Sequence, residues 1–316
     1  MASLQLYYKK YMLLNIIIII ATIAGLWYGA TWVVGSASNF AKKIGMSDLV
    51  IGLTVVAIAT SAPEFAVTVS ANLSGKSSIS VANVIGSDIF NLGFILGIVA
   101  IFGVIEISKQ LFYRDGLFLL FTGILLFIFF LDYRLSLFEG IILAGLLIAY
   151  LVFLAKLKRT LDEDIPYGEF RWYDVPKFLI GVGVIIFSAH YLVEASSEIA
   201  AALGVSDWLI GVTIVAAGTS APELATSIAA LVKGNHGMSI GNLIGSDLFN
   251  LLGVLGVAAI LKPLTINQSE LYNILILVGA LLILLIMMRT KWKLSKTEGI
   301  ILLLIALIRW SVDLII

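Results

Sequence analysis

The sequence predicts an all-α integral membrane protein with ten transmembrane helices, built as two inverted five-helix repeats whose core helices are kinked or discontinuous. Three observations support this fold class. The chain has 316 residues, of which 60% are hydrophobic and only 13% charged, whereas an ordinary soluble domain is about 25% charged. Ten apolar runs are long enough to cross a hydrocarbon core of about 30 Å. The sequence also repeats itself at an offset of 159 residues.

Composition excludes several classes of function. The 20 basic and 20 acidic residues give a formal net charge of zero, so a nucleic-acid partner or a polybasic surface is not indicated. The chain has no cysteine, which excludes disulfides, thiolate metal sites and cysteine nucleophiles. A bound metal ion must therefore be held by oxygen, nitrogen or thioether groups.

The apolar runs lack the period-2 alternation of membrane barrel strands, which favours helices. The first run is too long for a signal-peptide core, so we expect it to be retained. We expect spans at about 12–34, 48–73, 80–104, 115–132, 136–157, 176–197, 206–232, 238–261, 270–288 and 297–315.

One polar stretch divides the ten spans into five and five. It predicts a first repeat at 1–157, a linker at 158–175 and a second repeat at 176–316. Lysine and arginine crowd the loops on the linker's side, as they do in cytoplasmic loops. We therefore expect a multi-pass protein of the cell membrane with a cytoplasmic linker and both termini outside.

The internal repeat is strongest in two segments, at about 48–97 and 206–256. Residues 50–64 read VIGLTVVAIATSAPE and residues 209–223 read LIGVTIVAAGTSAPE, and GSDIFN at 86–91 matches GSDLFN at 245–250. An odd number of spans in each unit makes the second unit enter the membrane from the opposite side. Secondary transporters use such inverted repeats to present one site to each side in turn. A duplication that built only a scaffold would not concentrate its similarity in short polar segments.

Each strong segment holds a proline followed by a glutamate. Pro63 and Pro222 lie well inside spans, so we expect each helix to kink or unwind at the preceding Thr-Ser-Ala. Glu64 and Glu223 then lie at mid-membrane depth, where an unpaired charge costs at least about 2.5 kcal/mol. Every basic residue except Arg309 falls near a span end. A proton or a metal cation must therefore neutralise the two carboxylates.

These residues predict an oxygen-only cage with a formal charge of minus two. Its other oxygens would be freed backbone carbonyls and the hydroxyl groups of Thr60, Ser61, Thr219 and Ser220. Ca²⁺ takes six to eight oxygens in flexible geometry, so it suits this cage better than Mg²⁺ or Zn²⁺. One Ca²⁺, two Na⁺ or two protons would neutralise it, and competition among these ions would give obligatory countertransport.

A second polar stripe follows in each repeat. Its members recur every four residues and so share one helix face, and they are Asn83, Ser87 and Asn91, with Asn242, Ser246 and Asn250. Asn83 and Asn242 serve either the ion site or only helix packing. Asp88 and Asp247, one residue off this face, either extend the ion pathway or bond the helix backbone. Other polar or small residues are expected to serve the fold. The spacing Gly25-x-x-x-Gly29 is typical of close helix packing, and Ser47-Asp48 and Ser206-Asp207 are typical helix caps. The two histidines, His190 and His236, are isolated and receive no role.

Both segments resemble the alpha repeats of the Ca²⁺/cation antiporter superfamily, and most closely those of the prokaryotic sodium/calcium exchangers. Each alpha repeat has a G-T-S-x-P-E core followed by G-N-x-x-G-S-x-x-x-N or D, which this chain matches at 59–64 with 82–91 and at 218–223 with 241–250. The resemblance implies Ca²⁺ and Na⁺ binding at Glu64 and Glu223, with Thr60 and Thr219 at the Ca²⁺ site. It implies Na⁺ sites completed by Ser61, Ser87, Asn91, Ser220, Ser246, Asn250 and the carbonyls of Ala57 and Ala216. It also implies that the first and sixth spans slide as a gate.

The chain departs from the family pattern at three positions. Ala59 and Ala82 replace glycines of the first repeat, and Asn250 stands where some sodium/calcium exchangers have aspartate. Because this acid is missing, the number of ions that a relative exchanges in each transport cycle does not apply to this chain. Proton-coupled Ca²⁺ exchangers have a different core, with the acid after a Gly-Asn pair, so the motif favours Na⁺ coupling.

The leading hypothesis is therefore a Ca²⁺/Na⁺ antiporter that works by alternating access, with no cofactor and with no protein partner that the sequence indicates. The alternative uses the same site with H⁺ as the coupling ion. An intramembrane hydrolase with Asp88 and Asp247 as an acid pair lacks the Gly-x-Gly-Asp context and leaves the proline-glutamate segments unexplained. A Ca²⁺ channel is a further alternative, which saturable, counter-ion-dependent flux would exclude.

Overall fold

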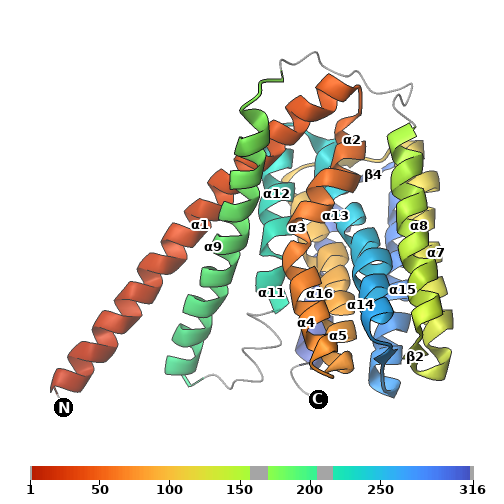
Figure 1. The fold of residues 1–316 in the computed structure, drawn as a ribbon. Coiled ribbons are helices and arrows are strands. Elements are labelled where there is room, and N and C mark those ends of the chain that lie inside the picture. Colours follow the sequence, from red (N-terminus) through yellow and green to blue (C-terminus); the bar gives the residue numbers. More distant parts are fainter. Residues whose placement is uncertain (1, 157–169, 205–215, 314–316) are drawn as a thin grey trace.

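The computed structural model describes residues 2–156, 170–204 and 216–313, and within these ranges the chain is almost entirely helical (Figure 1). Seven helical segments are long and apolar enough to cross a membrane, and an eighth candidate is a bent pair of helices at Asp48–Thr60 and Ala62–Leu73. The helical character of the predicted fold is thus confirmed.

The spanning segments follow the predicted order. They are α1 (Ala2–Ile44), α2 (Asp48–Ile51) with η1 (Gly52–Val56), α3 (Ala57–Thr60) and α4 (Ala62–Leu73), α5 (Ser77–Phe90) with η2 (Asn91–Ile95) and α6 (Leu96–Phe102), η3 (Leu111–Gly116) with α7 (Leu117–Phe129) and η4 (Phe130–Asp132), α8 (Leu137–Lys156), α9 (Asp174–Ala202), α13 (His236–Leu248) with η6 (Phe249–Val254) and α14 (Leu255–Leu261), and α15 (Gln268–Arg289).

The two remaining predicted spans are shorter helices. The run at 206–232 is described only from residue 216, as α11 (Ala216–Thr219) and α12 (Ala221–Val232), and the last run forms α16 (Lys296–Asp313). The cap predicted at Ser206-Asp207 and most of the linker lie outside the described residues. Ser47 does cap α2, since its Oγ accepts a hydrogen bond from the Val50 amide at 3.3 Å.

The first helix is longer than its hydropathy predicts. We expected it to end at residue 34, but α1 continues to Ile44. The polar stretch at 35–39 interrupts the apolar run, yet Ala37 and Ala41 remain buried in the protein core. Packing against neighbouring helices therefore extends the helix past the point where hydropathy falls.

Two short β-ladders tie the repeats together. Strand β1 (Ile105–Glu106) pairs antiparallel with β4 (Lys293–Leu294), and β2 (Arg134–Leu135) pairs with β3 (Leu264–Thr265). The offset of the sequence repeat makes β1 equivalent to β3 and β2 equivalent to β4. Figure 1 places β4 at one end of the bundle and β2 at the other, so equivalent strands lie at opposite ends. This arrangement is the structural signature of inverted repeats.

The buried hydrophobic residues form two clusters, a large one in the core and a smaller one that joins α1 and α9 to α2, η1, α12 and α13. The segments α5–α6 and α13–α14 are the most buried of the spanning segments. Helices α1 and α9 lie side by side at the edge of the bundle (Figure 1), and their residues Ala30, Val33 and Ile185 belong to the smaller cluster. A Cβ atom at Gly29 would lie 2.9 Å from the Gly181 carbonyl oxygen, so the predicted glycine packing is confirmed.

Helix α13 approaches the broken helix through glycine. A Cβ atom at Gly245 would lie 2.6 Å from Leu53 Cα and 2.8 Å from Ala57 Cβ. We expect Gly245→Ala to lower the stability of the purified protein by about 1–3 kcal/mol, because backbone on both sides must shift. Thermal unfolding in detergent measures the effect.

The matched control is Gly279→Ala in α15, where a Cβ atom has no neighbour within 4 Å. That substitution should raise stability by about 0.5–1 kcal/mol, since alanine loses less backbone entropy than glycine in a helix. Equal melting temperatures for the two variants would contradict the packing account.

Candidate cation site

Both proline segments break their helices where the sequence predicts. Helix α3 ends at Thr60 and α4 begins at Ala62, with a bend of 48° between the two halves. Ser61 at the break has φ −82° and ψ 11°, and its repeat equivalent Ser220 has φ −89° and ψ 6°. The prolines occupy the first helical turn after each break, where a missing N–H costs nothing.

The break places each glutamate at the start of a new helix. Glu64 lies in the first turn of α4 and Glu223 in the first turn of α12. The positive end of a helix dipole favours a carboxylate at this position, by about 0.3–1 kcal/mol at exposed sites and up to about 2 kcal/mol in partly buried ones. The exposed fractions are 1% for Glu64 and 0% for Glu223, so bulk water does not solvate either charge.

The two carboxyl groups face each other closely enough for their charges to interact. Glu223 Oε1 accepts a hydrogen bond from Ser61 Oγ at 3.0 Å and a weaker one from Ser246 Oγ at 3.5 Å. The Ser220 and Ser87 hydroxyl groups lie beside the Glu64 carboxylate, but Glu223 Oε2 and both Glu64 carboxylate oxygens make no hydrogen bond of full geometry with the described residues. Three buried carboxylate oxygens therefore remain open to another ligand.

No basic side chain neutralises this pair in the part of the chain that the structure describes. The ion pair found there joins Arg114 to Asp115 at 2.7 Å, and Tyr150 also donates to that carboxylate. Arg309 donates to the Asn273 side chain in another part of the bundle. The expectation that the two glutamates lack a basic partner thus agrees with the described geometry.

Hydroxyl groups surround the pair unequally. Thr60 Oγ1 lies 3.1 Å from Asn242 Oδ1 and 3.3 Å from Ser246 Oγ. Ser220 is fully buried, and its hydroxyl lies beside the Glu64 carboxylate, as the hydroxyl of its repeat equivalent Ser61 lies beside Glu223. The two half-sites therefore share these contacts, and of the two only the Ser61–Glu223 contact has full hydrogen-bond geometry.

Other predicted ligands lie near the break with different surroundings. Ser87 is buried, and Thr219 is partly buried at the end of α11. The Ala57 carbonyl accepts hydrogen bonds from the Ser61 amide at 3.0 Å and the Thr60 hydroxyl at 3.2 Å, so it is not free here. Ala216 is the first residue of α11. The described residues contain no group of three or more His, Cys, Asp or Glu side chains placed to hold a metal ion.

Asn83 and Asn242 make hydrogen bonds to neighbouring helices, which is the helix-packing role that the sequence analysis gave as one of two alternatives. Asn83 Nδ2 donates to Thr68 Oγ1 at 3.0 Å, and Asn242 Nδ2 donates to the equivalent Ser227 Oγ at 3.1 Å. Each amide also reaches the backbone carbonyl of its own repeat's glutamate at 3.4 Å. These contacts hold α5 against α4 and α13 against α12.

Asn91 and Asn250 make a crossed contact between the repeats, which the sequence did not predict. Asn91 Nδ2 donates to Asp247 Oδ1 and Asn250 Nδ2 donates to Asp88 Oδ1, both at 2.9 Å. The aspartates therefore bond side-chain amides and not helix backbone. Both asparagines lie in π-helical turns, η2 and η6, which occur frequently at functional sites. No sequence signal that we used indicates such turns.

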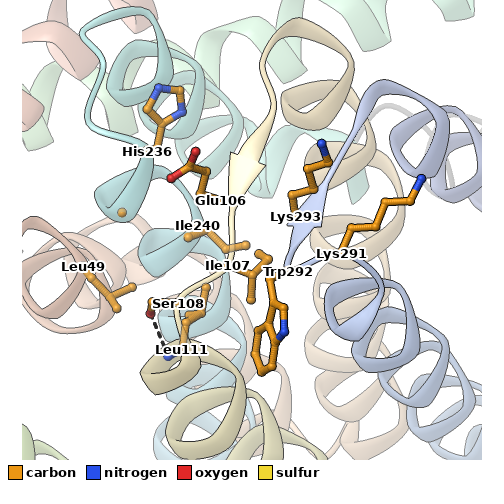
Figure 2. Close-up of a pocket in the computed structure, with 11 residues that line it drawn as sticks. Leu49, Glu106, Ile107, Ser108, Leu111, His236, Ile240, Lys291, Trp292 and Lys293 are labelled. Carbon is orange, nitrogen blue, oxygen red and sulfur yellow. Dashed lines mark hydrogen bonds between the residues drawn. The ribbon is translucent and has the colours of Figure 1, made fainter. Parts of the chain in front are cut away.

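A pocket of about 430 Å³ lies apart from this site, beside the β1–β4 ladder. Figure 2 shows His236 and Glu106 on one side of it and Lys291, Trp292 and Lys293 on the other. None of the predicted ion ligands lines it.

Comparison with known proteins agrees with this geometry. The family model described as "Sodium/calcium exchanger protein" matches residues 14–156 and 175–309. The sodium/calcium exchanger MaX1 of Methanosarcina acetivorans is 31% identical, with 92% of this chain and 95% of that protein aligned. The putative antiporter CaxA of Alkalimonas amylolytica is also 31% identical over the same shares of the two chains.

A solved structure has the same fold over nearly its whole length. The sodium-calcium exchanger NCX_Mj, in crystals soaked with Na⁺ and Sr²⁺, superposes with a TM-score of 0.83 at 31% identity, covering 95% of this chain and 99% of that one. The family match, the similar relatives and the shared ten-helix inverted-repeat fold lead to one conclusion. This chain belongs to the sodium/calcium exchanger family.

Proposed function

We propose that this protein is a secondary antiporter that exchanges Ca²⁺ for Na⁺, with Glu64 and Glu223 as a shared central cation site. The observation that carries the proposal is the buried carboxylate pair, three of whose four oxygens make no hydrogen bond of full geometry with the described residues. A formal charge of minus two in a water-poor core requires a cation. Ca²⁺ is a hard cation that prefers such oxygen ligands.

The hydroxyl groups complete the proposed Ca²⁺ position. Thr60 and Thr219 flank the two helix breaks, and Ser61 and Ser220 stand at the breaks themselves. Ser61 donates its proton to Glu223, so its oxygen lone pairs stay available to a cation. The Na⁺ positions would use the remaining predicted ligands, namely Ser87, Asn91, Ser246, Asn250 and the carbonyls of Ala57 and Ala216.

Competition for one negative site explains the coupling of the two fluxes. One Ca²⁺ or two Na⁺ neutralise the glutamate pair, whereas the unloaded pair keeps two charges in a medium of low dielectric constant. A protein that crosses between its two states only when neutralised exchanges one cation for another. It then needs no separate coupling device.

Alternating access would use α1 and α9 as the moving unit. These helices approach each other through Gly29 and Gly181, and the hydrophobic cluster that they share also includes Ala229 and Ala230 of α12. They also contact each other through Asn15, which donates to Glu198 at 2.8 Å. A pair held together in this way can slide along the core as one body, and the glutamates on α4 and α12 need not move.

Vesicle transport tests the proposal. Purified protein in liposomes should take up radiolabelled Ca²⁺ when an outward Na⁺ gradient drives the exchange. The Glu64→Gln variant should reduce that uptake by about 30-fold or more, since losing one charge of a buried site costs about 2–5 kcal/mol. Glu106→Gln, at an exposed carboxylate, is the matched control and should keep full activity. Uptake driven by a pH gradient and indifferent to Na⁺ would instead establish H⁺ coupling, and uptake retained by Glu64→Gln would overturn the site.

Labelling of single cysteines tests the orientation that we propose, with a cytoplasmic linker and both termini outside. The chain has no native cysteine, and Lys262 beside β3 and Lys293 in β4 are exposed. A membrane-impermeant maleimide should label Lys262→Cys in intact cells and Lys293→Cys only after permeabilisation. The reverse pattern would show that the topology is inverted.

A further inference from the structure

A second pair of buried carboxylates lies beside the glutamate pair. Asp88 in α5 and Asp247 in α13 are equivalent under the internal repeat, and both have an exposed fraction of 0%. Their charges interact with each other, and also with Glu64 in the case of Asp88 and with Glu223 in the case of Asp247. The core of the bundle therefore brings four carboxyl groups together, of which the proposed Ca²⁺ position uses two.

Each aspartate is only half satisfied by hydrogen bonds. Its Oδ1 accepts the amide group of an asparagine from the opposite repeat, Asn250 for Asp88 and Asn91 for Asp247, at 2.9 Å. Both Oδ2 atoms, and the Oδ1 atoms of both asparagines, are buried and accept no hydrogen bond from a donor among the described residues, and the two aspartate carboxyl groups contact each other. Since native proteins satisfy most buried polar atoms, four such oxygens in one cluster need an explanation.

The amide bonds also fix which atom each asparagine presents. With Nδ2 assigned as the donor to an aspartate, the atom that the Asn91 and Asn250 side chains can offer to a cation is the carbonyl oxygen. The cluster therefore combines two carboxylate oxygens with two amide oxygens, all within the buried core. Neither aspartate forms an ion pair with a basic group in the described part of the chain, where the ion pair found is Arg114–Asp115.

We propose that Asp88 and Asp247, together with the side-chain oxygens of Asn91 and Asn250, form a second position for a hard cation beside the Glu64–Glu223 pair. The cation would lie between the two Oδ2 atoms and neutralise charge that no described protein group offsets. This inference rests on the proposed function in one respect, because it takes the hard cations that the protein encounters to be the transported ones. The ligand class is an alkali or alkaline-earth ion.

A cation at this position would couple to the central site. The aspartate and glutamate charges interact directly, so neutralising the aspartates lowers the repulsion that the glutamates experience. The same cation would hold the two asparagines, and with them the π-helical turns η2 and η6. The occupancy of one position would then change the affinity of the other.

Anomalous diffraction tests the inference. Crystals of the wild-type protein would be soaked separately with Tl⁺, as a monovalent probe, and with Sr²⁺, as a divalent probe. We expect one anomalous peak between Asp88 and Asp247 in at least one soak, separate from a peak between Glu64 and Glu223. The soak that gives the peak identifies the charge class of the ligand.

The double variant Asp88→Asn with Asp247→Asn removes both charges and keeps the side-chain size. It should lose the peak between residues 88 and 247 and keep the peak at the glutamates. The inference would be overturned if wild-type crystals showed density at the glutamates but none between the aspartates in either soak. In that case the two aspartate carboxyl groups would share a proton and bind no cation. Density at the aspartates but none at the glutamates would support the inference and defeat the proposed function.

Discussion

The structure depends on one electrostatic constraint, which is that the Glu64 and Glu223 carboxylates are buried together with no basic side chain beside them in the described part of the chain. An isolated charge in such a medium is expensive. The helix breaks reduce that cost, because each glutamate lies in the first turn of a new helix, at the positive end of its dipole. In the function that we propose, a cation supplies the remainder, and the prolines, the serine at each break and the hydroxyl groups all serve this single requirement.

The internal repeat gives two equivalent half-sites that differ in geometry. Ser61 donates a hydrogen bond to Glu223, whereas the equivalent Ser220 hydroxyl lies beside Glu64 without full hydrogen-bond geometry. An inverted repeat that is symmetric in sequence can exchange these two arrangements between its halves. Such an exchange between the two halves is what the alternating access that we propose would use.

Hydropathy and proline position predicted most of the fold and the positions of the two helix breaks. The breaks at Ser61 and Ser220 follow from proline's missing N–H and its fixed φ, which act locally. The extension of α1 to Ile44 depends on burial of Ala37 and Ala41 against other helices, which a single segment does not encode. The crossed Asn91–Asp247 and Asn250–Asp88 contacts join residues 156 and 162 positions apart. Neither those contacts nor the π-helical turns around them have a local signal.

The central claim is that Ca²⁺ and Na⁺ compete for one carboxylate pair. Equilibrium binding of radiolabelled Ca²⁺ to the purified protein, at a series of Na⁺ concentrations, tests it most directly. Competition predicts that Na⁺ displaces Ca²⁺ completely, that excess Ca²⁺ restores the full binding stoichiometry, and that Glu64→Gln with Glu223→Gln removes the displaceable fraction. Ca²⁺ binding that is unchanged by saturating Na⁺, or that persists in the double variant, would contradict the account.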